Sequence, residues 1–188
     1  MNTMRSYVSR PRSALRALAA LLLLASVPAT LCALSPRAQE GAFWLEPTGG
    51  PYPRLAKGES IWVKVSLERQ RVYVMSEQAC VYTMVASTGL DLPADDRTPQ
   101  GTFHVQRERG LSFYSAKLKE GARYWVSWLN HGEYLFHSVP TDAKGRIIAD
   151  EARKLGQKAS HGCIRLSLAD AKWLYENLPF GAKVVIGP

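Results

Sequence analysis

The strongest constraint on the fold is a series of short segments in which apolar and polar residues alternate. The first runs over residues 61–67 (IWVKVSL), and segments 71–75 and 79–86 follow it after brief interruptions. Neighbouring side chains of a β-strand point to opposite faces, so this alternation indicates strands with one buried face. Glu68-Arg69-Gln70 supplies a turn between the first two segments. The domain is therefore predicted to begin with a β meander.

Similar patterns predict further strands at 102–106, 124–128, 133–137 and 183–186. Residues 89–101 are rich in Asp, Pro and Gly and cannot continue a sheet, so they are predicted to form a loop that can border a cleft. Residues 107–123 mix charged residues with two glycines. This second stretch is predicted to be an irregular excursion that could cover a site as a lid.

The sequence predicts one convincing helix, which begins after Ser167. Ser167 can cap the first turn, and Asp170 stands three residues later as in a capping box. Pro179 and Gly181 then end the helix. The apolar stripe between these limits consists of Leu168, Ala171, Leu174, Tyr175 and Leu178. The predicted fold is mostly β, a β-sandwich or partly closed barrel with one packed α-helix after the motif described below.

Residues 1–33 have the composition of a signal peptide. Arginines without any acidic residue precede an apolar stretch, which Pro28 and small residues follow. An uncleaved membrane anchor is the alternative, because residues 17–34 are mostly apolar and at the short end for a membrane span. A lipid attached to Cys32 is disfavoured, since Leu31 stands where a small residue would be needed. On either main reading the bulk of the chain lies outside the cytoplasm.

Two further ranges complete the predicted organisation of the chain. Residues 34–58 are rich in Pro, Gly and Ala and are predicted to be a linker or irregular lead-in. Residues 59–188 are predicted to form a single domain, since the chain is long enough to build one core without a metal or a disulfide framework.

The net charge of the chain argues against nucleic acid as a partner. The formal charge is +8, but residues 1–33 carry four arginines and no acid, which leaves 20 basic against 16 acidic residues, or +4, in the remainder. Those basic residues are scattered among acids rather than clustered. A mildly basic protein outside the cytoplasm suits an anionic polymer such as a cell wall.

The motif with the clearest chemistry is SHGCIR, at residues 160–165. A thiol attacks a carbonyl well only when a neighbouring group lowers its pKa or accepts its proton, and His suits that task near neutral pH. Cys163 is therefore a candidate nucleophile, with His161 or His137 as the base.

The spacing within the motif suggests a common orientation. On an extended segment, residues two apart share a face, so His161, Cys163 and Arg165 would point the same way. Gly162 would let a substrate approach the backbone. Arg165 is suited to bind a carboxylate, because its planar guanidinium meets one bidentately.

Two other interpretations of the cysteines and histidines remain open. Cys80 and Cys163 could form a disulfide in an oxidising compartment, although Cys80 lies in an apolar run where a free Cys serves as a small core residue. His137, His161 and Cys163 could also form a three-ligand zinc set.

These residues resemble the L,D-transpeptidases of peptidoglycan synthesis, the YkuD domain family. The family signature is a His followed some way on by Ser/Thr-His-Gly-Cys. Here it is carried by His137-Ser138 and Ser160-His161-Gly162-Cys163. Accessory motifs of the family are similar to Ser87-Thr88-Gly89, Thr98-Pro99-x-Gly101 and Leu155-Gly156. The resemblance covers about residues 60–187, with a long interval between His137 and Ser160 and with Arg165 where many members have Asn.

The resemblance implies catalytic roles for five residues. Cys163 would be the nucleophile, and His137 would be the general base that forms its ion pair. The backbone of Ser138 would orient that imidazole, and His161 would support the site. Backbone N–H groups around Gly162 and Cys163 would face the oxyanion of a tetrahedral intermediate.

The resemblance also implies contacts with substrate. Arg165 would bind a carboxylate of the peptide, and Ser160 is a second candidate for substrate binding. No metal and no other cofactor is expected.

The function implied by the resemblance is peptidoglycan L,D-transpeptidation. The thiolate would attack the L,D peptide bond of a stem tetrapeptide, release D-Ala, and transfer the acyl group to an amine of another stem. Peptidoglycan stem peptides would be the partners of a monomer, secreted or tethered to the membrane, and a carbapenem would acylate Cys163.

Two alternatives stay open, an L,D-carboxypeptidase and a non-catalytic cell-wall-binding module. A sortase would need a different sequence around its cysteine, and an NlpC/P60 endopeptidase usually places its cysteine before its histidine. A lowered pKa of Cys163 would favour catalysis over a binding role.

Overall fold

The computed structural model describes residues 42–56 and 58–188. Within these residues nine strands form one mixed sheet with the spatial order β4-β9-β1-β2-β3-β8-β7-β6-β5. The strands are β1 (Ile61–Ser66), β2 (Arg71–Ser76), β3 (Ala79–Ser87), β4 (Gly101–His104), β5 (Arg109–Ser115), β6 (Glu120–Leu129), β7 (Tyr134–Ser138), β8 (Ile164–Leu166) and β9 (Lys183–Gly187).

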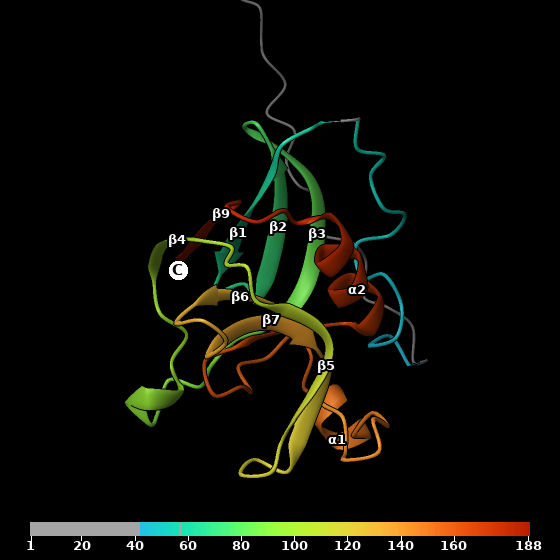
Figure 1. Ribbon diagram of the computed structural model, residues 1–188, viewed down its shortest axis with the longest axis vertical. Helices are drawn as coiled ribbons and strands as arrows, with labels where there is room; N and C mark the ends of the chain where they lie inside the picture. The colour runs from blue at the N-terminus through green and yellow to red at the C-terminus, as the bar shows by residue number, and fades with distance from the viewer. Residues whose placement is uncertain (1–41, 57) are drawn as a thin grey trace, which may run out of the picture.

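The sheet curls on itself, so that β4 at one edge comes into contact with β6 near the other edge (Figure 1). Most neighbouring strands are antiparallel, but β9 joins β1 and β8 joins β7 in parallel. The mostly-β prediction is confirmed, and the curled sheet corresponds to its partly closed barrel.

The predicted meander is the run β1-β2-β3, whose strands pair in sequence order. Its alternation matches the observed burial, because Ile61, Val63 and Val65 are buried whereas Lys64 is exposed. The buried side chains of this meander share one hydrophobic core with Phe136 of β7, Ile164 of β8 and residues of the C-terminal helix.

The predicted helix is α2 (Leu168–Asn177), which packs against β6, β7 and β8. Ser167 is its N-cap, and its hydroxyl accepts from the Asp170 N–H at 3.0 Å, as the capping pattern predicted. The described residues also contain a short helix α1 (Ala149–Ala152) and a 3₁₀ turn η1 (Ala94–Asp96). Neither was predicted, because a single turn is too short to show helical periodicity.

Residues 107–123 are not the irregular excursion that the sequence predicted. β5 and the first part of β6 pair as an antiparallel hairpin, from Arg109 with Val126 to Ser115 with Glu120. The hairpin extends away from the body of the sheet at the bottom of Figure 1. Because β5 is an edge strand with many exposed residues, it has no regular apolar face for the sequence to reveal.

Residues 42–56 have no regular strand or helix, yet they pack against the domain. Phe43 and Trp44 lie against a small buried cluster of Val139, Ala152 and Leu155. The Leu168 N–H at the start of α2 donates to the Trp44 carbonyl at 2.7 Å. Most of the predicted lead-in is therefore held on the surface of the sheet and helix.

The predicted signal or anchor at 1–33 lies outside the described residues, as do residues 34–41 of the lead-in. In the described ranges, no helix has both the length and the apolar character needed to cross a bilayer.

Candidate active site

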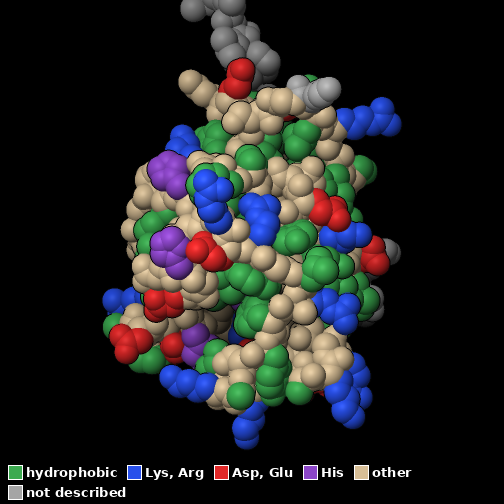
Figure 2. All heavy atoms as spheres, viewed as in Figure 1, with side chains coloured by type: hydrophobic (Ala, Val, Ile, Leu, Met, Phe, Trp, Pro, Cys, Tyr) green, Lys and Arg blue, Asp and Glu red, His purple; other side chains and the backbone are tan. Residues whose placement is uncertain are grey.

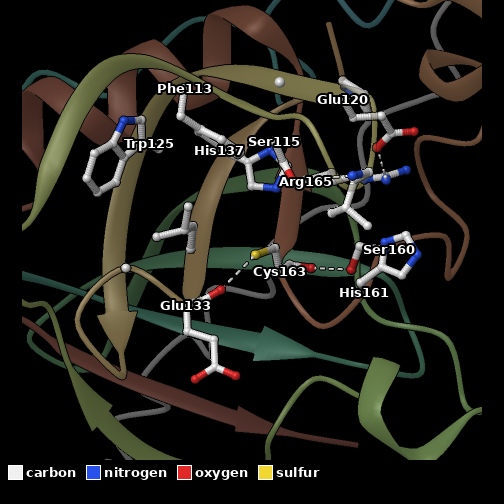
Figure 3. Close-up of a pocket in the computed structure, with 15 residues that line it drawn as sticks. Phe113, Ser115, Glu120, Trp125, Glu133, His137, Ser160, His161, Cys163 and Arg165 are labelled. Carbon is white, nitrogen blue, oxygen red and sulfur yellow. Dashed lines mark hydrogen bonds and ion pairs between the residues drawn. The ribbon is translucent and has the colours of Figure 1, made fainter.

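A cavity of about 390 Å³ opens between the β5–β6 hairpin, β7 and the loop that leads into β8. Figure 2 shows a hollow in the lower half of this face, beside a histidine side chain. The cavity is lined by Ser160, His161 and Cys163 of the SHGC motif, together with His137 and Arg165. Figure 3 is a close-up of the residues that line this cavity.

Cys163 lies at the end of the loop before β8 and is a free, half-buried thiol. Its S–H donates to the backbone carbonyl of Glu133, with 3.5 Å between sulfur and oxygen. Burial raises the pKa of the Cys163 thiol to about 11, although the Leu135 backbone N–H and the Arg165 guanidinium act in the opposite direction. The thiol is therefore protonated in the resting protein at neutral pH.

His137 lies on β7 and is almost fully buried. Its Nδ1 is 2.7 Å from the Ser138 carbonyl oxygen. Since a carbonyl only accepts, Nδ1 carries the proton and Nε2 keeps a free lone pair. Burial, and then the positive charge of Arg165, lowers the pKa of His137 to about 4, so this imidazole is neutral at rest.

The neutral thiol and neutral imidazole differ from the ion pair that the resemblance implied. Burial is the physical reason, because it disfavours the charged form of both groups. The lowered thiol pKa that would have favoured catalysis over wall binding is not found. A general base nevertheless does not need a preformed thiolate, since it can take the proton during the attack.

The loop around Gly162 does not continue as an extended strand. Gly162 has φ = +104°, and β8 begins only at Ile164. His161, Cys163 and Arg165 therefore do not form the predicted row. His161 is exposed, and in Figure 3 its ring lies beyond Ser160, on the side away from the Cys163 sulfur.

Gly162 also fits a position where no side chain can be accommodated. A Cβ atom there would lie 2.8 Å from Cε1 of Tyr134 and 3.2 Å from the Arg97 carbonyl oxygen. The residue is thus required by close packing as well as by its backbone conformation.

Ser160 uses its hydroxyl inside the loop. Its Oγ donates to the Cys163 carbonyl at 2.5 Å and accepts from the Gly162 N–H at 3.2 Å. Ser160 is buried and lines the cavity. Its hydroxyl, however, makes both of these bonds within the motif and so stabilises the loop. The Gly162 N–H, one of the two donors that the resemblance implies for an oxyanion, is therefore already bonded to Ser160.

The accessory motifs hold the SHGC loop from behind. The Thr98 hydroxyl donates to the Gly162 carbonyl at 2.8 Å and accepts from the Gly89 N–H at 2.8 Å. The Thr88 carbonyl accepts from the Ser160 N–H at 3.1 Å. Ser87 bonds to Lys154 and Gly156 in the same way, through its hydroxyl. These motifs were recognised in the sequence, but their spacing did not reveal that they support the SHGC loop through hydrogen bonds.

Arg165 is 4% exposed and lies in two ion pairs. Its two terminal nitrogens each lie 3.0 Å from a carboxylate oxygen, one of Glu120 and one of Glu151. Its Nε is buried without a hydrogen-bond partner. Sequence reasoning missed both glutamates, and these carboxylates already pair with both terminal nitrogens of Arg165.

The structure also decides the two alternative interpretations of the cysteines and histidines. Cys163 is free, so the Cys80–Cys163 disulfide is not formed. In residues 42–56 and 58–188, no three His, Cys, Asp or Glu side chains converge to hold a metal ion. The zinc set fails because His137 is buried against Ser138 while His161 lies at the rim.

The curled β domain thus presents a free thiol and an oriented imidazole in one cavity, the two kinds of group that a nucleophile and its base require. Comparison with known proteins identifies the family. The sequence matches the YkuD family, L,D-transpeptidase catalytic domain, over residues 60–186. The chain belongs to this family.

Individual relatives agree with that assignment. The chain is 53% identical over 143 residues, 76% of this chain and 73% of the relative, to a Bacillus subtilis (strain 168) protein named "Putative L,D-transpeptidase YciB". An L,D-transpeptidase (Yku) structure from Stackebrandtia nassauensis is 26% identical with a TM-score of 0.52, covering 72% of this chain and 58% of that one.

A second solved structure shares the fold at lower identity. The LD transpeptidase LdtMt1, solved in complex with imipenem, is 22% identical with a TM-score of 0.56. The match covers 69% of this chain and 60% of that one. This chain thus spans only about three fifths of these two solved chains.

Proposed function

We propose that the protein is a peptidoglycan L,D-transpeptidase with Cys163 as nucleophile and His137 as general base. The observation that carries the proposal is that a free thiol and a Ser138-oriented imidazole line the same cavity. Membership of the YkuD family supplies the reaction class. His137 is preferred to His161 as base because it is buried and has a fixed tautomer, whereas His161 is exposed at the rim.

In the first half-reaction the Nε2 lone pair of His137 takes the proton of the Cys163 thiol. The sulfur attacks the carbonyl carbon of the bond between the diamino acid and D-Ala, which gives a tetrahedral oxyanion. The Cys163 N–H is the candidate donor to that oxyanion, since the Gly162 N–H already bonds to Ser160. The C–N bond then breaks, and D-Ala leaves as an amine with the proton from His137.

In the second half-reaction an amine of another stem attacks the thioester carbonyl. His137 accepts a proton from that amine, and the C–S bond breaks. The proton then returns to sulfur, which restores the thiol and leaves a new amide cross-link. If water attacks instead of the amine, the product is a free carboxylate and the enzyme acts as an L,D-carboxypeptidase.

Acylation by a carbapenem tests the nucleophile and the base. Intact-protein mass spectrometry should find a one-to-one adduct on the wild-type protein. Cys163→Ala should abolish it and His137→Ala should slow it by about 100-fold or more. His104→Ala, at an exposed position on β4, is the matched control and should react as wild type. An adduct that survives in Cys163→Ala would refute the assignment.

The substrate and the acceptor are tested separately. Muropeptides containing tetrapeptide stems, incubated with the protein, should lose D-Ala and gain cross-linked dimers in the mass spectrum. Loss of D-Ala without dimers would identify the carboxypeptidase. Unchanged muropeptides, together with the absence of a carbapenem adduct, would favour the non-catalytic wall-binding module.

We also propose that the protein acts outside the cytoplasm as a monomer, either secreted or tethered by its N-terminal segment. Membership of the L,D-transpeptidase family supports the location, because the proposed substrate, peptidoglycan, lies outside the cytoplasm. Fractionation of cells with N-terminal sequencing would separate a cleaved signal from a retained anchor, and light scattering would test the monomer.

A further inference from the structure

We propose that Glu120 and Glu151 hold Arg165 beside His137 and offset its charge, so that the imidazolium can form when Cys163 gives up its proton. In this view Arg165 is a positioning residue that acts through His137, and it is not the anchor for a substrate carboxylate. The inference rests on the proposed function, since it assigns a role within the same acylation step.

The first support is the geometry of the cluster. Nη1 of Arg165 lies 3.0 Å from Glu151, and Nη2 lies 3.0 Å from Glu120. The Arg165 side chain is 5% exposed, and the carboxylates are 20% and 24% exposed. Figure 3 shows the guanidinium turned toward Glu120, away from the cavity centre where the Cys163 sulfur lies. The cluster is therefore a mostly buried unit, in which ion pairs are screened less than at the surface.

The cluster joins three segments that are far apart in sequence. Glu120 begins β6 in the hairpin, Glu151 lies on α1, and Arg165 lies on β8. Glu151 belongs to the long interval between His137 and Ser160. That interval thus contributes a charge to the site in addition to its length.

The second support is the register of the two central strands. β7 and β8 are parallel, and His137 pairs directly with Arg165. Neighbouring residues of a parallel pair share one face of the sheet, so the imidazole and the guanidinium stem are side by side. On another side the Phe113 ring meets the His137 ring edge-on, with 5.7 Å between centroids. The imidazole is therefore held between an aromatic ring and a charged side chain.

The third support is the charge balance around His137. Arg165 is the charged group that acts on the imidazole, the Cys163 thiol lines the same cavity, and β5 brings the Phe113 ring against the imidazole. An uncompensated guanidinium would repel an imidazolium, which must form as the thiol is deprotonated. Two carboxylates bonded to Arg165 reduce that repulsion. Lys154 in turn bonds to Glu151 at 2.6 Å, on the outer side of the cluster.

The test is the pH dependence of carbapenem acylation in Glu151→Gln. The variant keeps the shape of the side chain but removes one compensating charge. We expect its acylation rate at pH 7 to fall about three- to tenfold, with the acid limb of the profile shifted to lower pH. Asp150→Asn is the matched control, because Asp150 is adjacent on α1 and makes only an exposed ion pair with Arg153. It should overlay the wild type.

A second variant and a second readout keep the inference falsifiable. Glu120→Gln removes the other carboxylate and should shift the acid limb in the same direction, which covers the case in which Glu151→Gln fails to fold. With a tetrapeptide donor, Glu151→Gln should lower kcat and leave KM unchanged. If Arg165 were instead the anchor for a substrate carboxylate, Glu151→Gln would weaken the competing pair at Nη1, and KM would fall.

Three outcomes are distinguishable. A wild-type adduct with shifted profiles in both glutamate variants supports the inference. A wild-type adduct with overlaid profiles in the folded variants overturns it and leaves the proposed function intact. Absence of an adduct on the wild-type protein defeats the proposed function, and the inference with it.

Discussion

At Gly162 the backbone has a left-handed φ of +104°, and a Cβ atom there would lie too close to Tyr134 and Arg97. Gly162→Ala should therefore cost about 2–3 kcal/mol and displace Cys163, because the Cβ must move the Tyr134 ring. Gly181→Ala is the control, since Gly181 also has positive φ but a Cβ there meets no atom within 4 Å. Urea unfolding and carbapenem labelling of both variants check this. Equal losses of stability would show that steric contact plays no part.

His137 links stability to pH. Its pKa is lowered to about 4 in the folded protein, whereas an unfolded chain binds that proton near pH 6.5. The unfolded state therefore binds more protons as the pH falls, and stability is lost between about pH 6.5 and 4. The full contribution is on the order of 3 kcal/mol. Urea titrations at pH 7.5 and 4.5 should give a smaller difference for His137→Gln than for the wild type. Identical differences would contradict the assignment.

Among single residues, the sequence identified the proposed nucleophile and base better than the charged residues around them. Cys163 and His137 stand in a motif whose residue types suggest their chemistry. Glu120 and Glu151 lie 45 and 14 residues from Arg165 and share no pattern with it. The raised pKa of Cys163 depends on burial, which only the folded chain defines. The site could be found from the sequence, whereas its resting charge state could not.

At the scale of elements, α2 holds the N-terminal lead-in through one buried carboxylate. Asp170 accepts hydrogen bonds from the Thr48 N–H and hydroxyl, from the Tyr52 hydroxyl at 3.0 Å and from the Tyr82 hydroxyl at 3.3 Å. Burial raises the pKa of Asp170, although these donors act in the opposite direction. The helix, the lead-in and β3 thus meet at a single acceptor.

Asp170→Ala should destabilise the protein by about 3 kcal/mol, since it leaves several partly buried donors unpaired. It should also make residues 46–53 sensitive to limited proteolysis. Glu176→Ala on the same helix removes only an exposed ion pair with Lys172 and should change stability by less than about 0.5 kcal/mol. Thermal melts and protease mapping test both variants. A lead-in as resistant in Asp170→Ala as in the wild type would contradict this role.

The elements differ in how well the sequence predicted them. The meander and α2 present one apolar face to the core, so their periodicity is visible in the sequence. The β5–β6 hairpin borders the cavity at the edge of the sheet, where no β5 residue is buried. Glycines and charges are tolerated there, and the strand pattern was hidden for that reason.

For the whole molecule, the predicted domain start at residue 59 can be tested against the packing of residues 42–56. A chain that begins at residue 59 lacks Phe43, Trp44, Thr48 and Tyr52, which contact the second hydrophobic cluster and Asp170. It should melt about 10 °C or more below a chain that begins at residue 42. Calorimetry of the two chains makes the comparison. Equal melting temperatures would support the start at residue 59.

The C-terminal strand occupies an internal position in the sheet, between β4 and β1. Until residues 183–187 have formed β9, β4 and β1 each have an unpaired edge and the curled sheet lacks one strand. β8, which follows the reactive cysteine, also comes late in the chain. During synthesis the first 160 residues therefore contain His137, the proposed base, without Cys163, the proposed nucleophile. We therefore expect the proposed reactivity of Cys163 to appear only once β9 has joined β4 and β1 into one sheet.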